Sequence, residues 1–321
     1  MRAIVLHHPG GPEALSYEEV PTPSTKPGWS LIKVRGFGIN RSEIFTRNGW
    51  SPAVQLPRIL GIEAVGTVVE TTDEVNLPEG QTVISIMGEM GRAFDGGYAE
   101  YALLPNDQLY PVHTNLSWAE LAAVPETYYT AYGSLMSLFL QPHDHLLIRG
   151  ATSGVGTAAA KLARAIQNDV VITGTTRKPA KKERLLQTPI DDVVIERDGE
   201  LETENQYNKI LELVGPKTMQ DSLAHLAGPG GVMCITGELG GEWSTKDFDP
   251  IASIPSGSYL TAFNSGKVTE FALNAMLHLI EEAHIDVHPT KVFDLEHTAD
   301  AHAFLDSADS FGKVVVLPFG E

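Results

Sequence analysis

The residues whose types and spacing first suggest chemistry lie in the stretch RGATSGVG, which joins an apolar run to an alanine-rich helical pattern. Small residues let a phosphate approach the backbone, and the helix that follows presents free N–H groups and a positive dipole end. Gly154, Gly156 and Ala159 fit the spacing of a dinucleotide-binding motif, and Ala151, Ser153 and Gly156 fit it in a second register. Both registers remain open at this point. The residues predicted to hold a pyrophosphate are Gly150, Ala151, Ser153, Gly154, Val155 and Gly156.

A basic stretch, GTTRKPAKKERL, follows the second predicted strand. An NAD site usually places an acid roughly 20 residues beyond the glycine motif, where it accepts the ribose hydroxyls. Here that place holds Thr176, Arg177, Lys178 and Lys181, and no acid occurs before Glu183. A solvated basic helix start is the alternative. Because the chain is strongly acidic, we favour a site for the 2′-phosphate of NADPH.

Later strand-like runs end in residues that belong at the ligand-binding edge of an open parallel sheet. The strand ends in KILELVG, GVMCITG and SYLTAF supply these residues. The further cofactor-binding candidates are therefore Val214, Gly215, Thr236, Gly237 and Phe263.

The composition excludes several classes of protein. The chain has 321 residues, of which 42% are hydrophobic and 20% charged, as expected for a globular protein. Its 23 Lys and Arg against 41 Asp and Glu give a formal charge of -18, so nucleic acid and anionic membranes are poor partners. The single cysteine, Cys234, excludes an intrachain disulfide and is predicted to lie in the core. Without a secretory or membrane-spanning apolar segment, we expect a cytoplasmic protein.

The periodicity of apolar residues predicts an α/β protein with two parts, a β-rich unit and a unit in which strands and helices alternate. Up to about residue 116 the chain shows short extended runs separated by Pro, Gly and Asn, which predict a β-rich unit. At Ser117 the sequence pattern changes, and Ser117 with Glu120 has the spacing of a helix capping box. Apolar strands then alternate with amphipathic helices, which predicts a doubly wound parallel sheet. After Phe263 a helix, a strand, a helix and a final strand could return to the first unit.

Over nearly its whole length the chain resembles the zinc-independent quinone oxidoreductase branch, the zeta-crystallin-like branch, of the medium-chain dehydrogenase/reductase superfamily. The matching stretches include VRGFGINRSEIFTRNG, LPRILGIEAVGTVVE, DGGYAEYALLP, AAVPETYYTAYGSL, RGATSGVG and FGKVVVLP. The resemblance implies a GroES-like catalytic domain at residues 1–119, an NADP-binding Rossmann domain at 120–263 and a C-terminal return to the catalytic domain at 264–321. It places the active site in the cleft between the two domains.

The resemblance also implies roles for single residues. Asn40, in the GIN element, is the candidate hydrogen-bond donor to a developing oxyanion. Ser42 stands where zinc-dependent relatives carry a proton-relay hydroxyl, and Arg41 is placed to reach the cofactor pyrophosphate. Tyr128 and Thr130 match residues beside the nicotinamide, and Tyr128 is also a candidate proton donor. A turn-forming role for Asn40 and a core role for Tyr128 are the simpler alternatives.

Zinc ligands are missing at the positions where zinc-dependent relatives have Cys and His. Those positions hold Asn40 and Ile62, with Glu126 near the third, and the segment 87–97 contains no cysteine. Isoleucine cannot coordinate a metal, and Asn with Glu makes a poor zinc site. We therefore predict an enzyme without zinc, which would need an acceptor that is already electron-poor.

Three functions remain open. The first is NADPH-dependent reduction of a small quinone, and the second is reduction of the C=C bond of an α,β-unsaturated ketone, aldehyde or acyl thioester. The third is an NADPH-binding sensor without turnover. Phe45, Trp50 and Ser51 stand where many quinone reductases carry tyrosines, so the acceptor need not be a simple benzoquinone. The resemblance also implies a homodimer formed through the apolar edge strand IPSGSYLTAF.

Overall fold

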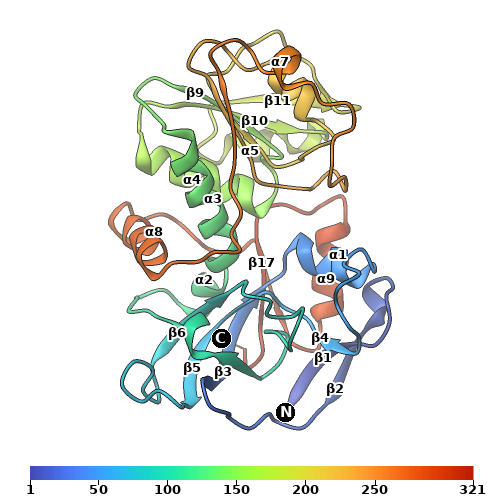
Figure 1. The fold of residues 1–321 in the computed structure, drawn as a ribbon, viewed down its shortest axis with the longest axis vertical. Helices are drawn as coiled ribbons and strands as arrows, with labels where there is room; N and C mark the ends of the chain where they lie inside the picture. The colour runs from blue at the N-terminus through green and yellow to red at the C-terminus, as the bar shows by residue number, and fades with distance from the viewer. Residues whose placement is uncertain (321) are drawn as a thin grey trace. The chain divides into compact units, whose positions relative to one another are not determined.

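The computed structural model describes residues 1–320, which form two compact units (Figure 1). The first unit comprises Met1–Thr127, Gly266–Asn274 and Val287–Glu321, and the second comprises Tyr128–Ser265 and Ala275–Asp286. This grouping differs from the predicted division at 119/120 and 263/264 in two places. The first unit continues to Thr127, and the second half of helix α8 (Glu270–Glu282) belongs with the parallel-sheet unit.

The first unit is built on two sheets. One is a three-stranded antiparallel sheet of order β2-β1-β4. The other runs β16-β17-β3-β5-β6-β8, with β7 paired to β3. The strands are β1 (Arg2–Leu6), β2 (Leu15–Glu19), β3 (Trp29–Gly38), β4 (Arg58–Ile59), β5 (Glu63–Glu70), β6 (Thr82–Ile86), β7 (Tyr101–Pro105), β8 (Tyr110–Pro111), β16 (Lys291–Asp294) and β17 (Val314–Leu317).

Part of the C-terminal tail belongs to this first unit. β17 pairs antiparallel with β3, and helix α9 (Thr298–Asp306) contributes Ala301 and Leu305 to the same core as β1, β3 and β5. Helix α1 (Arg41–Arg47) follows β3 directly, and α2 (Trp118–Ala122) packs on β3 and β17. In Figure 1 the C-terminal strand β17 accordingly lies among strands from the N-terminal part of the chain.

The second unit is a doubly wound sheet of order β12-β11-β10-β9-β13-β14-β15. β9 to β11 and β13 to β15 are parallel, and β12 adds an antiparallel edge strand. The strands are β9 (His145–Arg149), β10 (Val171–Thr176), β11 (Asp192–Arg197), β12 (Glu200–Leu201), β13 (Lys209–Glu212), β14 (Val232–Ile235) and β15 (Tyr259–Ala262). Strand order reverses between β9 and β13, which is the switch point where such sheets bind ligands.

The helices of the second unit are α3 (Pro125–Leu138), α4 (Gly154–Ile166), α5 (Lys182–Leu186), α6 (Met219–Ala224) and α7 (Pro250–Ser253), together with most of α8. Ser153 caps α4 by accepting a hydrogen bond from the Gly156 N–H. The alternation of strands with helices from β9 to β14 confirms the predicted fold class.

The predicted capping box is also confirmed, because the Ser117 side chain accepts from the Glu120 N–H and the Glu120 side chain accepts from the Ser117 N–H. The helical stretch that follows is interrupted between Ala122 and Pro125, so that α2 and α3 are separate helices. Proline lacks an N–H and disfavours a helical residue before it, which accounts for the break.

Cys234 is fully buried, as predicted. Among the described residues, no helix is long and apolar enough to cross a membrane.

Candidate functional site

The glycine turn lies at the carboxyl end of β9, at the switch point of the parallel sheet. Gly150 has a φ of +82°, which favours glycine, and its N–H donates to Thr175 Oγ1 at 3.0 Å. Ser153 Oγ donates to the Gly150 carbonyl at 2.8 Å and accepts from the Gly156 N–H at 3.0 Å. One side chain therefore fixes both the turn and the first turn of α4.

The structure decides between the two registers of the glycine motif. A Cβ on Gly156 would lie 2.6 Å from the Gly150 carbonyl oxygen and 2.7 Å from Ala151 Cα. Gly156 is thus the position at which helix and strand backbones meet, which is the role of the third glycine in the dinucleotide motif. The register Ala151, Ser153, Gly156 fits this geometry.

The basic stretch follows β10, the strand beside β9. Thr176 ends β10 and its hydroxyl accepts from the Lys178 N–H at 3.1 Å, so it shapes the start of the loop. Arg177 and Lys178 are exposed, and Lys181 is half-buried at the end of a short 3-10 turn. The structure thus presents cations at the strand end where the sequence predicts contact with a 2′-phosphate.

The other predicted cofactor residues follow the carboxyl ends of β13, β14 and β15. Gly215 has a φ of +92°, and a Cβ there would lie 2.4 Å from the Gly237 carbonyl oxygen. Thr236 Oγ1 is 2.7 Å from Ser134 Oγ of α3. Phe263 follows β15 and packs at a ring distance of 6.1 Å from Tyr129. The predicted residues Val214, Gly215, Thr236, Gly237 and Phe263 therefore share the sheet edge that holds the glycine turn.

Tyr128 and Thr130 are buried on α3. The Tyr128 hydroxyl donates to the Asp286 carbonyl at 3.5 Å, and burial, with a smaller effect of the Asp286 charge, raises its pKa well above the ordinary value. A phenol with a raised pKa is a weak acid at neutral pH. Burial therefore keeps the Tyr128 phenol protonated at neutral pH.

A buried ionic network that the sequence reasoning missed supports the switch point. Arg149, the last residue of β9, is fully buried and pairs with Glu196 at 3.1 Å and Asp221 at 2.6 Å. Glu212, the last residue of β13, lies 3.9 Å from Arg149 and accepts the N–H groups of the next loop, Val214 at 2.7 Å and Gly215 at 3.0 Å. Burial raises the pKa of Glu212, and Arg149 opposes that shift. The Glu212 carboxylate therefore fixes the loop that follows β13, and Arg149 ties the end of β9 to β11 and α6.

In the first unit, Asn40 is held by a buried pair of opposite charges. Its Nδ2 donates to Glu63 Oε1 at 2.8 Å, and its Oδ1 accepts from Lys313 Nζ at 2.6 Å. Lys313 Nζ also donates to Glu63 Oε1 at 2.7 Å, and Glu63 Oε2 accepts from the Glu126 N–H at 2.7 Å. A Cβ on Gly38 would lie 2.2 Å from Lys313 Cε, which explains the glycine of the GIN element. We call Asn40, Glu43, Glu63 and Lys313 the Asn40 cluster.

Glu43 is the fourth member of this cluster. It lies on α1, is 1% exposed, and accepts from the Ile62 N–H at 3.0 Å through Oε1, while its Oε2 is buried without a partner. Burial is the main cause that raises its pKa to about 7, and the nearby Glu63 adds to the shift. Its contact with Asn40 Nδ2, at 3.5 Å, is at the outer limit of a hydrogen bond.

Arg41 and Ser42 also have partners within the first unit. Arg41 donates to Asp306 Oδ1 at 2.7 Å and to the Leu305 carbonyl at 2.8 Å, so both of its terminal nitrogens are engaged on α9. Ser42 Oγ accepts from Arg92 Nη2 at 2.6 Å, which leaves the hydroxyl proton of Ser42 to donate. Two of the five N–H donors of Arg41 are used in these contacts, so the predicted pyrophosphate contact would have to use the others.

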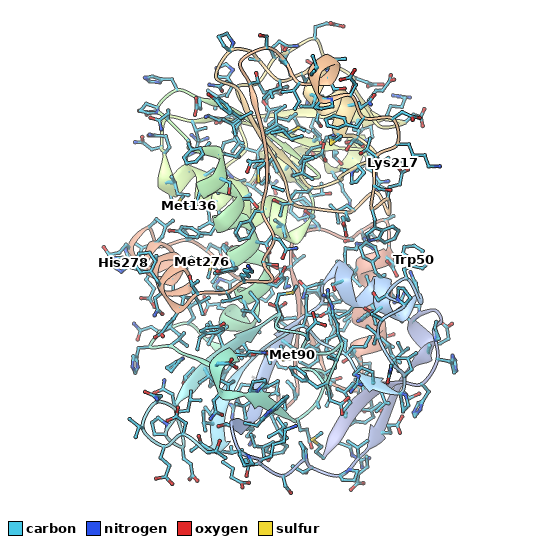
Figure 2. The ribbon with its side chains drawn as sticks, viewed as in Figure 1. Trp50, Met90, Met136, Lys217, Met276 and His278 are labelled. Atoms are coloured by element: carbon cyan, nitrogen blue, oxygen red, sulfur yellow. The ribbon has the colours of Figure 1, made fainter. Side chains whose placement is uncertain are left out.

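Aromatic side chains flank α1. Phe45 and Trp50 stack at 5.6 Å between ring centroids, and Trp50 is 52% exposed just beyond the helix, where Figure 2 labels it. Ser51 Oγ accepts from Thr46 Oγ1 at 3.0 Å. Of these three predicted positions, Phe45 lies on α1, and Trp50 and Ser51 follow its C-terminal end.

The donor set does not fit zinc. Asn40 is engaged by Glu63 and Lys313, and Ile62 is a buried hydrocarbon. Across residues 1–320, no group of three or more His, Cys, Asp or Glu side chains is placed to hold a metal ion. The cation beside Asn40 is the Lys313 ammonium.

Two family models match the chain. Residues 26–114 match the alcohol dehydrogenase GroES-like domain, and residues 189–316 match the zinc-binding dehydrogenase model. Together with the doubly wound sheet and its glycine turn, these matches define a protein with a GroES-like unit and a Rossmann unit.

Similar proteins and solved structures identify the class of oxidoreductase more closely. The chain is 28% identical to the quinone oxidoreductase of Lama guanicoe over 330 residues, covering 99% of this chain and 97% of that protein. It is 34% identical to the putative quinone oxidoreductase YhfP of Bacillus subtilis over 221 residues, or 66% of each chain. The crystal structure of Bacillus subtilis yhfP with NAD bound has a TM-score of 0.83 at 25% identity and covers 98% of both chains. The chain belongs to the medium-chain dehydrogenase/reductase superfamily of oxidoreductases, in its quinone oxidoreductase branch.

The sequence reasoning did not name Glu43, Glu63, Lys313 or Arg149 as site residues. Each lies within or beside an apolar element, and a charge in such a place must be paired once it is buried. Glu63 and Lys313 even occur in the stretches GIEAVG and FGKVVVLP that carry the resemblance. A search for partners of strand charges would have found them.

Proposed function

We propose that the protein is an NADPH-dependent quinone oxidoreductase that needs no zinc. The observation that carries the proposal is the Ser153-capped glycine turn at the switch point of the sheet, with Arg177 and Lys178 beyond the neighbouring strand. Small residues and the start of α4 would hold the pyrophosphate, and the two cations would hold the 2′-phosphate. Bound NADPH would supply the hydride.

NADPH is favoured over NADH by charge. No carboxylate follows β10 where an NAD-specific site places one, and Arg177 has no ion pair within residues 1–320. The chain has a formal charge of -18, and an arginine without an ion pair in such a chain can bind a phosphate group. The YhfP structure with NAD bound makes cofactor preference the first property to measure.

Asn40 is the candidate donor to the acceptor oxygen. Lys313 fixes the carbonyl end of its amide, and Glu63 takes one N–H at 2.8 Å. The second N–H is only weakly held by Glu43 at 3.5 Å, so it remains available to an oxygen that gains negative charge. A quinone is electron-poor enough to accept hydride with this help alone, which is why the donor set does not need a metal.

Ser42 supports the second candidate function, reduction of an enone. Its hydroxyl accepts from Arg92 at 2.6 Å and keeps a proton to donate, and the neighbouring positive charge makes that hydroxyl a better acid. Reduction of an activated C=C bond needs such a proton at the α-carbon. Replacing Ser42 with alanine should lower the rate of 2-alkenal reduction more than the rate of quinone reduction.

The test is NADPH oxidation, followed by nicotinamide absorbance, with benzoquinone, phenanthrenequinone and a 2-alkenal. It is repeated with NADH and after EDTA treatment. We expect quinone turnover that prefers NADPH and is insensitive to EDTA. Arg177→Ala and Lys178→Ala should each reduce the preference for NADPH over NADH about tenfold, the effect of losing ~1.4 kcal/mol of phosphate contact. Lys182→Ala, in the same basic stretch, is the matched control.

Three outcomes would contradict the proposal. A rate abolished by EDTA would make the zinc argument wrong. Equal use of NADH by the unaltered enzyme would remove the role of Arg177 and Lys178. NADPH binding without turnover of any acceptor would favour a sensor.

We also propose a homodimer formed through β15. This strand is the edge of the parallel sheet, and its first residue, Tyr259, is 64% exposed. An uncovered edge strand can pair with a second copy. Light scattering that reports a monomer would refute this assembly.

A further inference from the structure

A cavity in the first unit lies apart from every residue assigned above. Its volume is about 440 Å³, within the range of small-molecule sites. Its walls come from the β1 and β4 strands, the connection between β2 and β3, the loop at residues 93–96, and β7. Neither the Asn40 cluster nor Ser42 lines it.

The cavity has an aromatic wall. Trp29 and Phe94 meet edge to face, with ring centroids 5.0 Å apart and planes at 80°. Tyr101 of β7 and several prolines extend the apolar lining. Such a surface suits a flat, apolar ligand.

Cations predominate at this wall, although the chain as a whole is strongly acidic. Lys26 Nζ lies 3.8 Å from the centroid of Trp29, and no carboxylate within residues 1–320 pairs with it. Arg58 is the second cation, and Asp95 is the only carboxylate residue in the lining.

Arg58 has unmet hydrogen-bonding capacity. Its Nη1 donates to Asp95 Oδ1 at 2.9 Å, whereas its Nε is buried and has no partner. No bond within residues 1–320 uses its Nη2 either. A buried N–H without a partner is costly, and in native proteins it often marks a missing water or ligand. Asp95 shares its Oδ1 with the Ile59 N–H at 3.2 Å, so it cannot satisfy the whole guanidinium group.

We propose that this cavity is a binding site for a small aromatic carboxylate. The ring of the ligand packs against Trp29 and Phe94, and its carboxylate takes the unused Nη2 N–H groups of Arg58 with Lys26 nearby. Excess positive charge over an apolar wall selects an anion that is also flat and apolar, and it disfavours both inorganic phosphate and neutral hydrocarbons.

The test uses 2-naphthoate as the probe and isothermal titration calorimetry on the full-length protein. We expect saturable binding, with a Kd at least about tenfold lower than that of the neutral analogue 2-naphthamide. Arg58→Gln should weaken naphthoate binding about tenfold, and Lys26→Gln should weaken it several-fold. Lys33→Gln is the matched control, because Lys33 also lies over an aromatic ring, Phe319, at 4.2 Å but does not line the cavity.

Fluorescence then locates the probe. Naphthoate should quench the emission of Trp29, and Trp29→Phe should remove that quenching. Equal affinity for the amide, or equal affinity of Arg58→Gln, Lys26→Gln and Lys33→Gln, would overturn the site. Quenching that persists in Trp29→Phe, or no binding at millimolar probe, would overturn it as well. The amide comparison and Lys26→Gln still decide the question if Arg58→Gln fails to fold.

Discussion

Replacing Lys313 with methionine tests whether the Asn40 cluster is held by a buried charge pair. Lys313 is 7% exposed and Glu63 is fully buried, and their charged atoms lie 2.7 Å apart. Methionine keeps the apolar stem of the side chain and removes the ammonium. Glu63 then keeps only the N–H groups of Asn40 and Glu126.

The expected cost follows from that loss. Removing one partner of a buried pair leaves an uncompensated charge and destabilises a protein by about 3–5 kcal/mol. Glu63→Gln should also be destabilising, because the amide of glutamine would face the Glu126 N–H as a second donor. The double variant leaves no unpaired charge, so its loss should be smaller than the sum of the single losses by about 2–3 kcal/mol.

The assay is urea unfolding followed by tryptophan fluorescence in a Trp243→Phe background. The other three tryptophans, Trp29, Trp50 and Trp118, all belong to the first unit, so the signal reports the unit that contains the cluster. Lys33→Met is the control and should cost less than about 1 kcal/mol. Single losses that add to within about 0.5 kcal/mol of the double loss would refute the pairing. Lys313→Arg should recover stability and the turnover rate together if the cation also positions Asn40.

Three further predictions concern titration and the glycine turn. The pKa of Glu43 in the folded protein, about 7, lies above its ordinary 4.5, so the free energy of unfolding should fall as pH rises between these values. Glu43→Gln should remove that pH dependence. At pH 8 the variant should be more stable than the parent by up to about 3 kcal/mol in the same urea assay. His302 is buried between Tyr98 and Arg47, and burial, assisted by Arg47, lowers its pKa to about 3. The stabilisation that neutral His302 provides is therefore present above about pH 6.5. As pH falls toward 3, the free energy of unfolding should decrease by about 1.4 kcal/mol per pH unit. His302→Gln should lack this decrease, which a comparison with the parent protein would show. Gly156→Ala should weaken NADPH binding at least about tenfold by calorimetry, because its Cβ would lie 2.6 Å from the Gly150 oxygen; unchanged affinity would exclude the assigned register.

The fold could be predicted because its signals are local. The capping residues Ser117 and Ser153, the strand–helix alternation and the glycine turn each depend on neighbours in sequence. The break before Pro125 was also available from a local rule, that proline ends a preceding helix. The assignment of the second half of α8 to the parallel-sheet unit depends on tertiary contacts, which periodicity does not report.

The candidate site was predicted only where backbone geometry defines it. Gly150, Ser153 and Gly156 act through missing or short side chains next to one another, so their spacing is visible in sequence. Asn40 was found through the resemblance, but its partner Lys313 lies 273 residues away in the chain. The cavity around Arg58 had no sequence signal, because its walls come from separate segments.

Buried charges explain how both units hold polar groups in place. Arg149 and Glu212 end adjacent strands, and Glu212 fixes the loop that follows β13. Glu63 with Lys313 fixes the Asn40 amide. Hydrophobic replacements of such pairs are often as stable as the pairs themselves, so stability alone does not explain their presence. In both places the charged side chains instead fix the direction of a hydrogen-bonding group: the N–H of Gly215 in one case and the amide of Asn40 in the other. If that is their role, apolar replacement of a whole pair should preserve folding and still reduce turnover.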